Sequence, residues 1–391
     1  MGEIVERQRS YPLSRDVETE DKTGYRYIHY GDIHKQVADL ITCDEQLPSI
    51  KGGDYVQLSQ GDLVLADASE DYIGIAEPSV ILHEPIDKVI AGLHTIALRP
   101  SNANSLFLYY LLHTEKFKKF GSHVGTGLKV FGITFNNLSL FETALPSTEE
   151  QEKVSNLLRT LDNTLTLHKR KCEALKRLKK AYLQMMFPQS RESVPRVRFK
   201  GFTGEWEQRN LGDVAEIASG GTPDTTNSDY WDGDIDWYSP VEIGKEIYAF
   251  SSQRKITELG LKKSSAKILP ANRTILFTSR AGIGDMAILK NSAATNQGFQ
   301  SLVVNNDFDV YFIYSMGSKI KEYALKNASG STFLEISGKG LSKMDMLTPS
   351  TEEQTTIGNF FYNLDEQITT QQTKLNKLNQ LKQAYLQKMF V

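Results

Sequence analysis

The chain has 391 residues, of which 40% are hydrophobic and 24% are charged, and its formal net charge is −3. This length predicts two or three domains with apolar cores, and the weak negative charge argues against a protein that binds nucleic acid indiscriminately through a basic surplus. The two cysteines, Cys43 and Cys172, stand far apart without metal-ligand spacing, which excludes a disulfide framework and a zinc site. Since the sequence contains neither a signal peptide nor an apolar membrane span, we expect a cytoplasmic protein.

In chain order, short β-type runs alternate with loops rich in glycine, proline, asparagine and aspartate. The first series has runs at 25–28, 62–66 and 89–98 and then a helical stretch at 105–120. The second series has runs at 235–238, 274–277 and 301–304 and then a helical stretch at 308–327. Both series predict α+β domains with many loops.

A long repeat follows each series. Residues 146–187 and 349–390 align without a gap at an offset of 203, and 20 of the 42 positions are identical. Both copies begin with Pro-Ser-Thr-Glu-Glu-Gln, in which a hydroxyl can cap a helix and the acidic pair complements the helix dipole. The repeat therefore predicts two equivalent long helices.

Apolar residues in both copies recur at spacings of three and four residues, which is the heptad pattern of a coiled coil. The positions that we assign to helix pairing and partner docking are Leu158, Leu161, Leu165, His168, Leu175, Tyr182, Phe361, Leu364, Ile368, Gln371, Leu378 and Tyr385. The polar residues His168 and Gln371 would fix the register at some cost in stability. The alternative is two unrelated amphipathic helices, each packed on its own domain. It fits less well because charged residues cover most of the helix surface and leave only a narrow apolar stripe, which suits one partner helix.

Weaker matches extend the repeat into the preceding domains. Residues 107–112 match 310–315 at the same offset of 203, residues 62–65 resemble 274–277 at 212, and residues 2–5 resemble 212–215 at 210. The chain is therefore a tandem of two units. Its predicted parts are domain 1 at 1–145, a central helix at 146–190, domain 2 at 191–346 and a second long helix at 347–391. In this alignment Met1 falls on Leu211, so the first unit has no counterpart of residues 199–207.

No catalytic or metal-binding pattern accompanies the repeat. The seven histidines all lie within the first 168 residues without a ligand cluster, and the second unit has none. The sequence also lacks HExxH, a phosphate-binding loop, a dinucleotide fingerprint and the Asp/Asn-Pro-Pro-aromatic sequence of an amino-methyltransferase. Glu242 and Lys245 are separated by two residues, whereas the Glu-x-Lys motif of nucleases has one residue between them. We therefore expect a chain that is not an enzyme.

Domain 2 instead contains loops suited to recognition. Residues 219–226 and 278–284 combine glycines and hydroxyls with Arg280, and residues 296–300 add amides. An amide offers a donor and an acceptor that suit an adenine edge, and an arginine suits guanine or phosphate. Taken singly, each of these loops is more often a structural turn than a binding site.

Together these motifs resemble the specificity subunit of type I restriction-modification enzymes. The resemblance rests on the Pro-Ser-Thr-Glu-Glu-Gln helices ending in Ala-Tyr-Leu-Gln-x-Met-Phe, and on residues 220–223, 279–284 and 296–299. It implies two target-recognition domains, each reading one half of an asymmetric bipartite DNA target. It also implies that the two helices pair as an antiparallel coiled coil, set the spacing and dock two methyltransferase subunits, with restriction subunits as further partners.

The same resemblance implies that S-adenosylmethionine, ATP and Mg²⁺ belong to the partner subunits, and that this chain binds no cofactor or metal of its own. The candidate DNA-contacting residues are Thr222, Tyr238, Ser239, Lys245, Ser279, Arg280, Asn296 and Gln297 in domain 2, and Tyr30, His34, Lys35 and Lys129 in domain 1. The alternative is a scaffold whose tandem domains bind a ligand other than DNA, which explains the repeat but not the loops.

The net charge is unevenly distributed along the chain. It is −7 for residues 1–145 (13 basic, 20 acidic), +4 for 146–187, and 0 for both 188–346 and 347–391. Because neither domain has the basic surplus of a strong non-specific binder, we expect partner subunits to supply much of the affinity for the DNA backbone.

Overall fold

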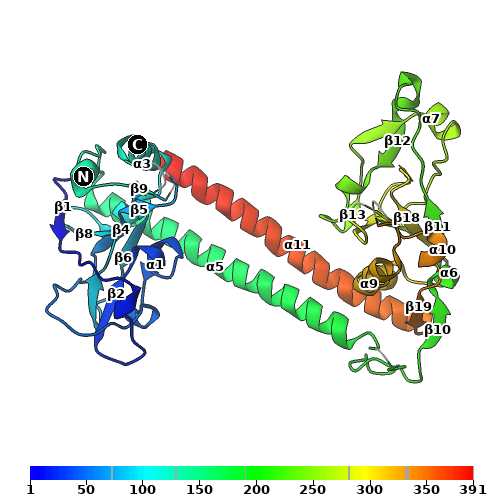
Figure 1. The fold of residues 1–391 in the computed structure, drawn as a ribbon, viewed down its shortest axis with the longest axis horizontal. Coiled ribbons are helices and arrows are strands. Elements are labelled where there is room, and N and C mark those ends of the chain that lie inside the picture. Colours follow the sequence, from blue (N-terminus) through cyan, green and yellow to red (C-terminus); the bar gives the residue numbers. More distant parts are fainter. Residues whose placement is uncertain (72–73, 128–129, 190, 281, 331–333, 391) are drawn as a thin grey trace. The chain divides into compact units, whose positions relative to one another are not determined.

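Two compact units make up the chain, and each contains one of the predicted domains. Unit 1 comprises Met1–Lys169 with Thr373–Val391, and unit 2 comprises Arg170–Gln372. The computed structural model describes every residue except 72–73, 128–129, 190, 281, 331–333 and 391. Both long helices, α5 (Thr148–Met185) and α11 (Thr351–Lys388), contribute residues to both units (Figure 1).

Each unit is built around a five-stranded mixed sheet. In unit 1 the strand order is β1 (Val5–Gln8), β8 (Thr95–Pro100), β4 (Leu63–Ala66), β6 (Pro78–Ile81) and β3 (Leu40–Ile41). In unit 2 the order is β11 (Ala215–Ser219), β18 (Gln300–Val304), β15 (Thr274–Phe277), β16 (Met286–Leu289) and β13 (Tyr248–Ala249). All neighbouring strands are antiparallel except the last pair of each sheet, which is parallel. The two sheets therefore have the same topology.

This common topology confirms that the chain is a tandem repeat of α+β domains. The start of each domain is also held in the same way: the α-amino group of Met1 donates to the Phe141 carbonyl at 2.6 Å, and the Leu211 N–H donates to the Met344 carbonyl at 2.8 Å. The predicted alignment of Met1 with Leu211 is therefore confirmed.

Shorter elements connect and cover the sheets. Those of unit 1 are η1 (Arg15–Val17), β2 (Tyr25–Ile28), α1 (Tyr30–His34), η2 (Asp44–Gln46), β5 (Ala68–Ser69), β7 (Lys88–Ala91), α2 (Ser105–Leu112), α3 (Glu115–Val124), β9 (Phe131–Gly132) and α4 (Phe135–Ser139). Those of unit 2 are β10 (Glu207–Asn210), α6 (Leu211–Val214), η3 (Ser228–Tyr230), β12 (Trp231–Tyr238), η4 (Pro240–Glu242), β14 (Arg254–Ile256), α7 (Glu258–Lys262), β17 (Ala294–Thr295), α8 (Val310–Ser315), α9 (Gly317–Asn327), α10 (Gly338–Leu341) and β19 (Asp345–Thr348).

The predicted run at 89–98 is wrong as a single strand, because a turn divides it into β7 and β8. At this turn a Cβ on Gly92 would lie 2.7 Å from the Tyr27 ring and 2.9 Å from the Ile28 carbonyl, so the backbone approaches β2 closely. His94 follows with φ of +54°. The two predicted helical stretches each contain two helices, α2 with α3 and α8 with α9.

The first short helix of each domain is anchored to the long helix that follows it. Asn104 caps α2, and its own N–H donates to the Gln151 side chain at 2.9 Å. Asp309 caps α8, and its N–H donates to the Gln354 side chain at 3.1 Å. The equivalent helix starts are therefore 205 residues apart, whereas the helix ends, Leu112 and Ser315, keep the offset of 203 predicted from the sequence. The predicted offset is wrong by two residues only at the starts of these helices.

The long helices pack together and run antiparallel within each unit, as predicted. In unit 1 the Lys382 ammonium lies 2.5 Å from the Asp162 carboxylate. In unit 2 the Lys179 ammonium lies 2.6 Å from the Asp365 carboxylate. Asp365 is the repeat equivalent of Asp162, and Lys382 is that of Lys179, each at the offset of 203. The two helix contacts are therefore equivalent in the sequence repeat.

Each domain also packs against the two helices. The Tyr110 hydroxyl donates to Asp162 and the Tyr311 hydroxyl donates to Asp365, both at 2.8 Å. The ring of Phe390, at the end of α11, lies 4.7 Å from that of Phe107 in the core of unit 1. The equivalent contact in unit 2 joins Phe187 to Phe312 at 5.4 Å. Every domain core is thus completed by the end of the helix that belongs to the other repeat.

The residues assigned to helix pairing differ in burial. Leu158, Leu161, Phe361, Leu364 and Gln371 are buried, and Leu165, His168, Leu175, Tyr182, Ile368, Leu378 and Tyr385 are half-buried. In unit 2 the Tyr182 ring contacts that of Phe360, with centroids 5.0 Å apart.

Candidate nucleic-acid interface

A second, smaller layer of strands forms the same frame in both units. In unit 1, β2 pairs in parallel with β7, and Ile28 lies opposite Ala91. In unit 2, β12 pairs in parallel with β17, and Tyr238 lies opposite Thr295. A capping box follows the first strand of each pair, formed by His29 with Asp32 in unit 1 and by Ser239 with Glu242 in unit 2. Residues 29 and 239 therefore occupy equivalent positions.

Two further loops meet this turn in the same way in both units. The N–H of Asp67 donates to the His94 carbonyl at 3.0 Å, and the N–H of Ser279 donates to the Gly298 carbonyl at 2.8 Å. Each unit thus brings together the turn after β2 or β12, the loop after β4 or β15, and the turn before β8 or β18. We call these three segments the recognition loops.

The recognition loops of unit 2 contain all of its predicted contact residues except Thr222 and Tyr238, which is the last residue of β12. The hydroxyl of Thr222 donates to the side-chain oxygen of Gln297 at 2.5 Å, so this residue also joins the group. A Cβ on Gly298 would lie 3.5 Å from the Arg280 guanidinium and 3.0 Å from the Asn296 side chain, which places these two side chains on the same small area. Gln297, next to Gly298, is exposed, and Lys245 is exposed in the segment after β12.

Some predicted residues of unit 2 have structural contacts instead. Tyr238 is 3% exposed and belongs to an apolar cluster, and its burial raises the pKa of its hydroxyl. Ser279 is fully buried, and its hydroxyl lies 3.4 Å from Glu335. The hydroxyl of Ser239 donates to Glu242 at 2.8 Å as part of the capping box. These residues shape the surface, whereas Arg280, Gln297 and Lys245 have side chains that a ligand can reach.

The recognition loops of unit 1 enclose a hollow of about 910 Å³. Tyr30, His34 and Lys35, which the sequence singles out, all line it. The Tyr30 ring lies 5.3 Å from that of His94, and His34 contacts the Ala68 carbonyl at 2.8 Å. Lys129 lies outside the described residues.

The hollow exists where unit 2 carries larger side chains. Ala68 forms a β-bridge with Gly132, and Arg280 forms one with Glu335. Because Gly132 and Glu335 are equivalent positions of the repeat, 203 residues apart, Ala68 occupies the position of Arg280. The N–H of Gly92 donates to Ile28 and that of Asn296 donates to Tyr238, so Gly92 stands in the place of Asn296. The two units therefore share a backbone frame but present different side chains.

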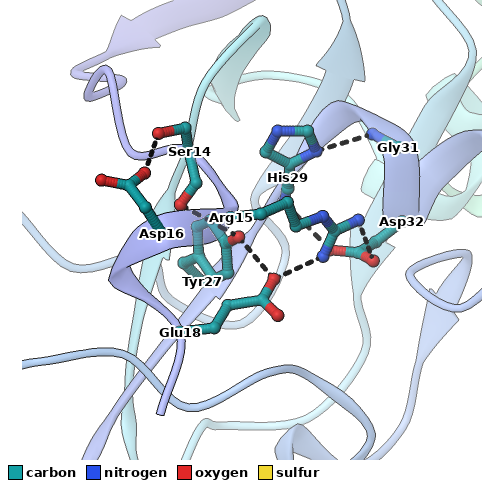
Figure 2. A network of polar contacts seen from close by, with 8 residues as sticks. All are labelled: Ser14, Arg15, Asp16, Glu18, Tyr27, His29, Gly31 and Asp32. Atoms are coloured by element: carbon teal, nitrogen blue, oxygen red, sulfur yellow. Dashed lines mark hydrogen bonds and ion pairs between the residues drawn. The ribbon is translucent and has the colours of Figure 1, made fainter.

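A polar network fixes one wall of the hollow (Figure 2). The Arg15 guanidinium donates to Asp32 at 2.7 Å and to Glu18 at 2.6 Å, and the Tyr27 hydroxyl also donates to Glu18. The Nδ1 atom of His29 accepts the N–H of Gly31 at 3.1 Å. Burial and the neighbouring Arg15 lower the pKa of His29. The imidazole is therefore neutral at pH 7, with its Nε2–H available as a donor.

Sequence reasoning missed Arg15, His29 and His94, which line the hollow with the predicted residues. In the part of the chain that the structure describes, no group of three or more histidine, cysteine, aspartate or glutamate residues is arranged to hold a metal ion. None of the described helices is long and apolar enough to cross a membrane.

The family model for the type I restriction modification DNA specificity domain matches residues 1–177 and again residues 203–380. The chain belongs to this family. The two matches cover the two domains and the greater part of both long helices, so the tandem repeat is a repeat of the specificity domain.

Curated relatives carry the same description. The MjaIX specificity subunit of Methanocaldococcus jannaschii is 38% identical over 181 residues, which are 44% of this chain and 42% of that protein. The EcoR124I/EcoR124II specificity subunit of Escherichia coli is 32% identical over 163 residues, or 39% of each chain. These alignments thus span about two fifths of either relative. The putative MjaX specificity subunit of Methanocaldococcus jannaschii is 23% identical over 94% of this chain and 87% of its own length.

Solved structures share the fold. The S subunit of a type I restriction-modification system from M. genitalium has a TM-score of 0.63 at 16% identity, over 100% of this chain and 94% of that one. A chain from a study of complex assembly and conformational transition of the type I R-M system has a TM-score of 0.54 at 17% identity, over 98% and 95% of the two chains. The architecture of tandem domains and paired helices is therefore that of known specificity subunits.

Proposed function

We propose that this chain is the sequence-recognition subunit of a type I restriction-modification complex, and that each domain reads one half of an asymmetric bipartite DNA target. The observation that supports this proposal is the equivalence of the recognition loops. Residues singled out independently in the two domains, such as His34 with Lys35 and Ser239 with Lys245, follow equivalent strands. A shared frame with different side chains is what two readers of different sequences require.

The side chains suggest how each half is read. In unit 2, Arg280 can donate two hydrogen bonds to guanine and Gln297 can pair with an adenine edge. In unit 1, the neutral imidazole of His29 offers a donor, and Tyr30 offers an aromatic face in the same hollow. We therefore expect two unlike half-sites.

The helices are assigned the role of spacer and docking surface. Each has 38 residues, and each is paired with the other by a buried or half-buried lysine–aspartate contact. At about 1.5 Å per residue such a helix is roughly 57 Å long. We propose that this length sets an unread gap between the half-sites, and that two methyltransferase subunits dock on the helices, with restriction subunits as further partners.

In this proposal the chain itself contributes no catalytic residue. Methyl transfer and ATP-dependent cleavage belong to the partner subunits, together with S-adenosylmethionine, ATP and Mg²⁺. The chain selects the site, and its partners carry out the chemistry.

The test is an exchange of domain 1. Residues 1–145 are replaced by the first domain of another family member, the chimera is expressed with its methyltransferase partner, and methylated adenines are mapped by sequencing. We expect one half-site to change and the other half-site and the gap to stay the same. If both half-sites change, or neither does, the domains do not read separately.

A further inference from the structure

The lobe of unit 2 formed by β12, β14 and α7 is unevenly charged: β12 carries three aspartates, whereas residues 254–267, which contain β14 and α7, carry a local excess of positive charge. Domain 2 as a whole is balanced, with 19 basic and 19 acidic residues between 191 and 346. Residues 254–267, however, contain five cations and only one acid, Glu258. We call the five cations the basic edge: Arg254, Lys255, Lys262, Lys263 and Lys267. In Figure 1, β12 and α7 lie at the end of unit 2 that is farthest from β19.

Four of these five charges are not neutralised within the described structure. Lys255 lies 3.4 Å from the Asp236 carboxylate. Arg254, Lys262, Lys263 and Lys267 are exposed, and none of them has a carboxylate partner among the described residues. Arg15 in unit 1 is a contrasting case, because two carboxylates surround its guanidinium. These four cations of the basic edge are therefore available to bind an anion.

Arg254 is held in place by stacking. Its guanidinium carbon lies 3.6 Å from the centroid of the Trp231 ring and 5.8 Å from that of Trp237. Both indoles are themselves fixed, because Trp231 donates to the Asp224 carbonyl at 3.0 Å and Trp237 donates to the Gly221 carbonyl at 2.8 Å. A stacked guanidinium keeps its N–H edge available, and little rotamer entropy is lost when that edge binds a phosphate.

The basic edge adjoins the recognition loops. A Cβ on Gly221 would lie 2.3 Å from the Ser265 hydroxyl and 2.6 Å from the Ala266 nitrogen, so the segment that carries Lys263 and Lys267 touches this glycine. The next residue, Thr222, donates to Gln297. The segment that carries Lys263 and Lys267 therefore lies directly beside the segment that contacts Gln297.

The equivalent segment of unit 1 has no such edge. In unit 2, Asp236 pairs with Lys255, and at the equivalent place in unit 1 Arg26 pairs with Ser49. Residues 48–61 of unit 1 contain only Lys51 and Asp54 as charged residues. The lobe of unit 2 also has an acidic part, since residues 224–236 hold five aspartates and no cation. Within unit 2, an anionic ligand is thus attracted to residues 254–267 and not to residues 224–236.

We propose that the basic edge binds the phosphate backbone of duplex DNA beside the half-site read by unit 2, and that it supplies the sequence-independent part of this chain's affinity. This inference rests on the proposed function. Each cation that contacts a phosphate releases a condensed counterion, so its contribution is measured by the salt dependence of binding.

The experiment measures the affinity of the full-length chain, assembled with its methyltransferase partner, for a random-sequence duplex across a series of salt concentrations by fluorescence anisotropy. The test variant is K262A/K263A/K267A. The matched control, K22A/K51A/K116A, removes three exposed lysines from unit 1. Each phosphate contact contributes about 0.9 to the slope of log K against log salt. We expect the slope of the test variant to fall by roughly 2–3 while that of the control stays unchanged.

Two substitutions separate charge from stacking at Arg254. We expect R254A to lower the slope by about 0.9 and R254K to keep the slope while weakening binding, because lysine retains the charge but not the planar stack.

An unchanged slope in the triple variant, or an equal fall in the control, overturns the inference. If methylation still occurs at the same sequence, the proposed function survives that result. If the unmodified complex neither binds DNA nor methylates it, both fail.

Discussion

Replacing Asp365 by asparagine tests whether the lysine–aspartate contacts stabilise the pairing of the long helices. The Asp365 side chain is 6% exposed and accepts from Lys179 at 2.6 Å and from the Tyr311 hydroxyl at 2.8 Å. In D365N the tyrosine keeps an acceptor, but the ammonium loses its counter-charge. Removing one partner of a fully buried pair costs about 3–5 kcal/mol. Because Lys179 is 24% exposed and can turn toward water, we expect a loss of about 2–3 kcal/mol.

Urea unfolding followed by tryptophan fluorescence measures this loss, because Trp206, Trp231 and Trp237, the three tryptophans of the chain, all lie in unit 2. On heating, about 2–3 kcal/mol corresponds to a fall in Tm of roughly 5–10 °C for a unit of this size. The matched variant is D162N, in which the replaced side chain is 19% exposed. We expect it to cost about 1 kcal/mol, because water already reaches its carboxylate.

The double variant K179M/D365N completes the cycle. Once methionine replaces the lysine, no buried cation requires a counter-charge, so we expect at least half of the lost stability to return. Unit 1 contains no tryptophan, so the unfolding of D162N is followed by the far-UV circular dichroism of the helices, and D365N is also measured in this way. If D365N leaves the urea midpoint unchanged, or if D162N is the more costly of the two by circular dichroism, the reasoning from burial is wrong.

Three further predictions concern spacing, readout and pH. Inserting one helical turn after Thr166 and another after Thr369 should lengthen the unread gap of the target, and methylation mapping that finds the original gap would contradict the spacer role. R280A should lower discrimination in the half-site of unit 2 by about 1–3 kcal/mol and leave the other half-site unchanged, as measured by competition with single-base variants of the target. Burial disfavours ionisation of Asp44, yet hydrogen bonds from backbone N–H groups and a histidine outweigh it and lower the pKa of this carboxyl. Its stabilisation should therefore be present at neutral pH and disappear as the pH falls below about 4. Denaturation curves of D44N and the unmodified chain should converge in acid, and a constant difference would contradict this account.

The paired helices could be predicted from the sequence because their residues recur without a gap. Asp162 and Asp365 are identical in the two copies, as are Lys179 and Lys382, but this identity does not reveal that each aspartate contacts a lysine of the other copy. The heptad spacing alone placed the lysines in the seam but gave no partner for them. The contact became visible only when the antiparallel register was known.

The recognition loops could be predicted only in part. Glycines, amides and Arg280 identified those of unit 2, but the same positions in unit 1 hold Ala68 and Gly92, which show no binding pattern in the sequence. Surfaces that read different sequences retain a backbone frame rather than residue types. The stacking of Arg254 on Trp231 joins strands that are distant in sequence, so no local motif could reveal it. The error of two residues at the starts of α2 and α8 arose because α2 has eight residues and α8 has six, whereas both helices end at the same distance from their long helix.

The ring of Phe390 in the core of unit 1 has a consequence for the order in which the chain folds. Domain 1 is synthesised first, but Leu386 and Phe390, which complete its core, are added only after all of unit 2. Unit 2 is continuous in sequence and contains its own Phe187. Synthesis proceeds at about 5–20 residues per second, and domains generally fold as they emerge. The complete set of core residues of unit 2 is therefore synthesised before the residues that complete the core of unit 1.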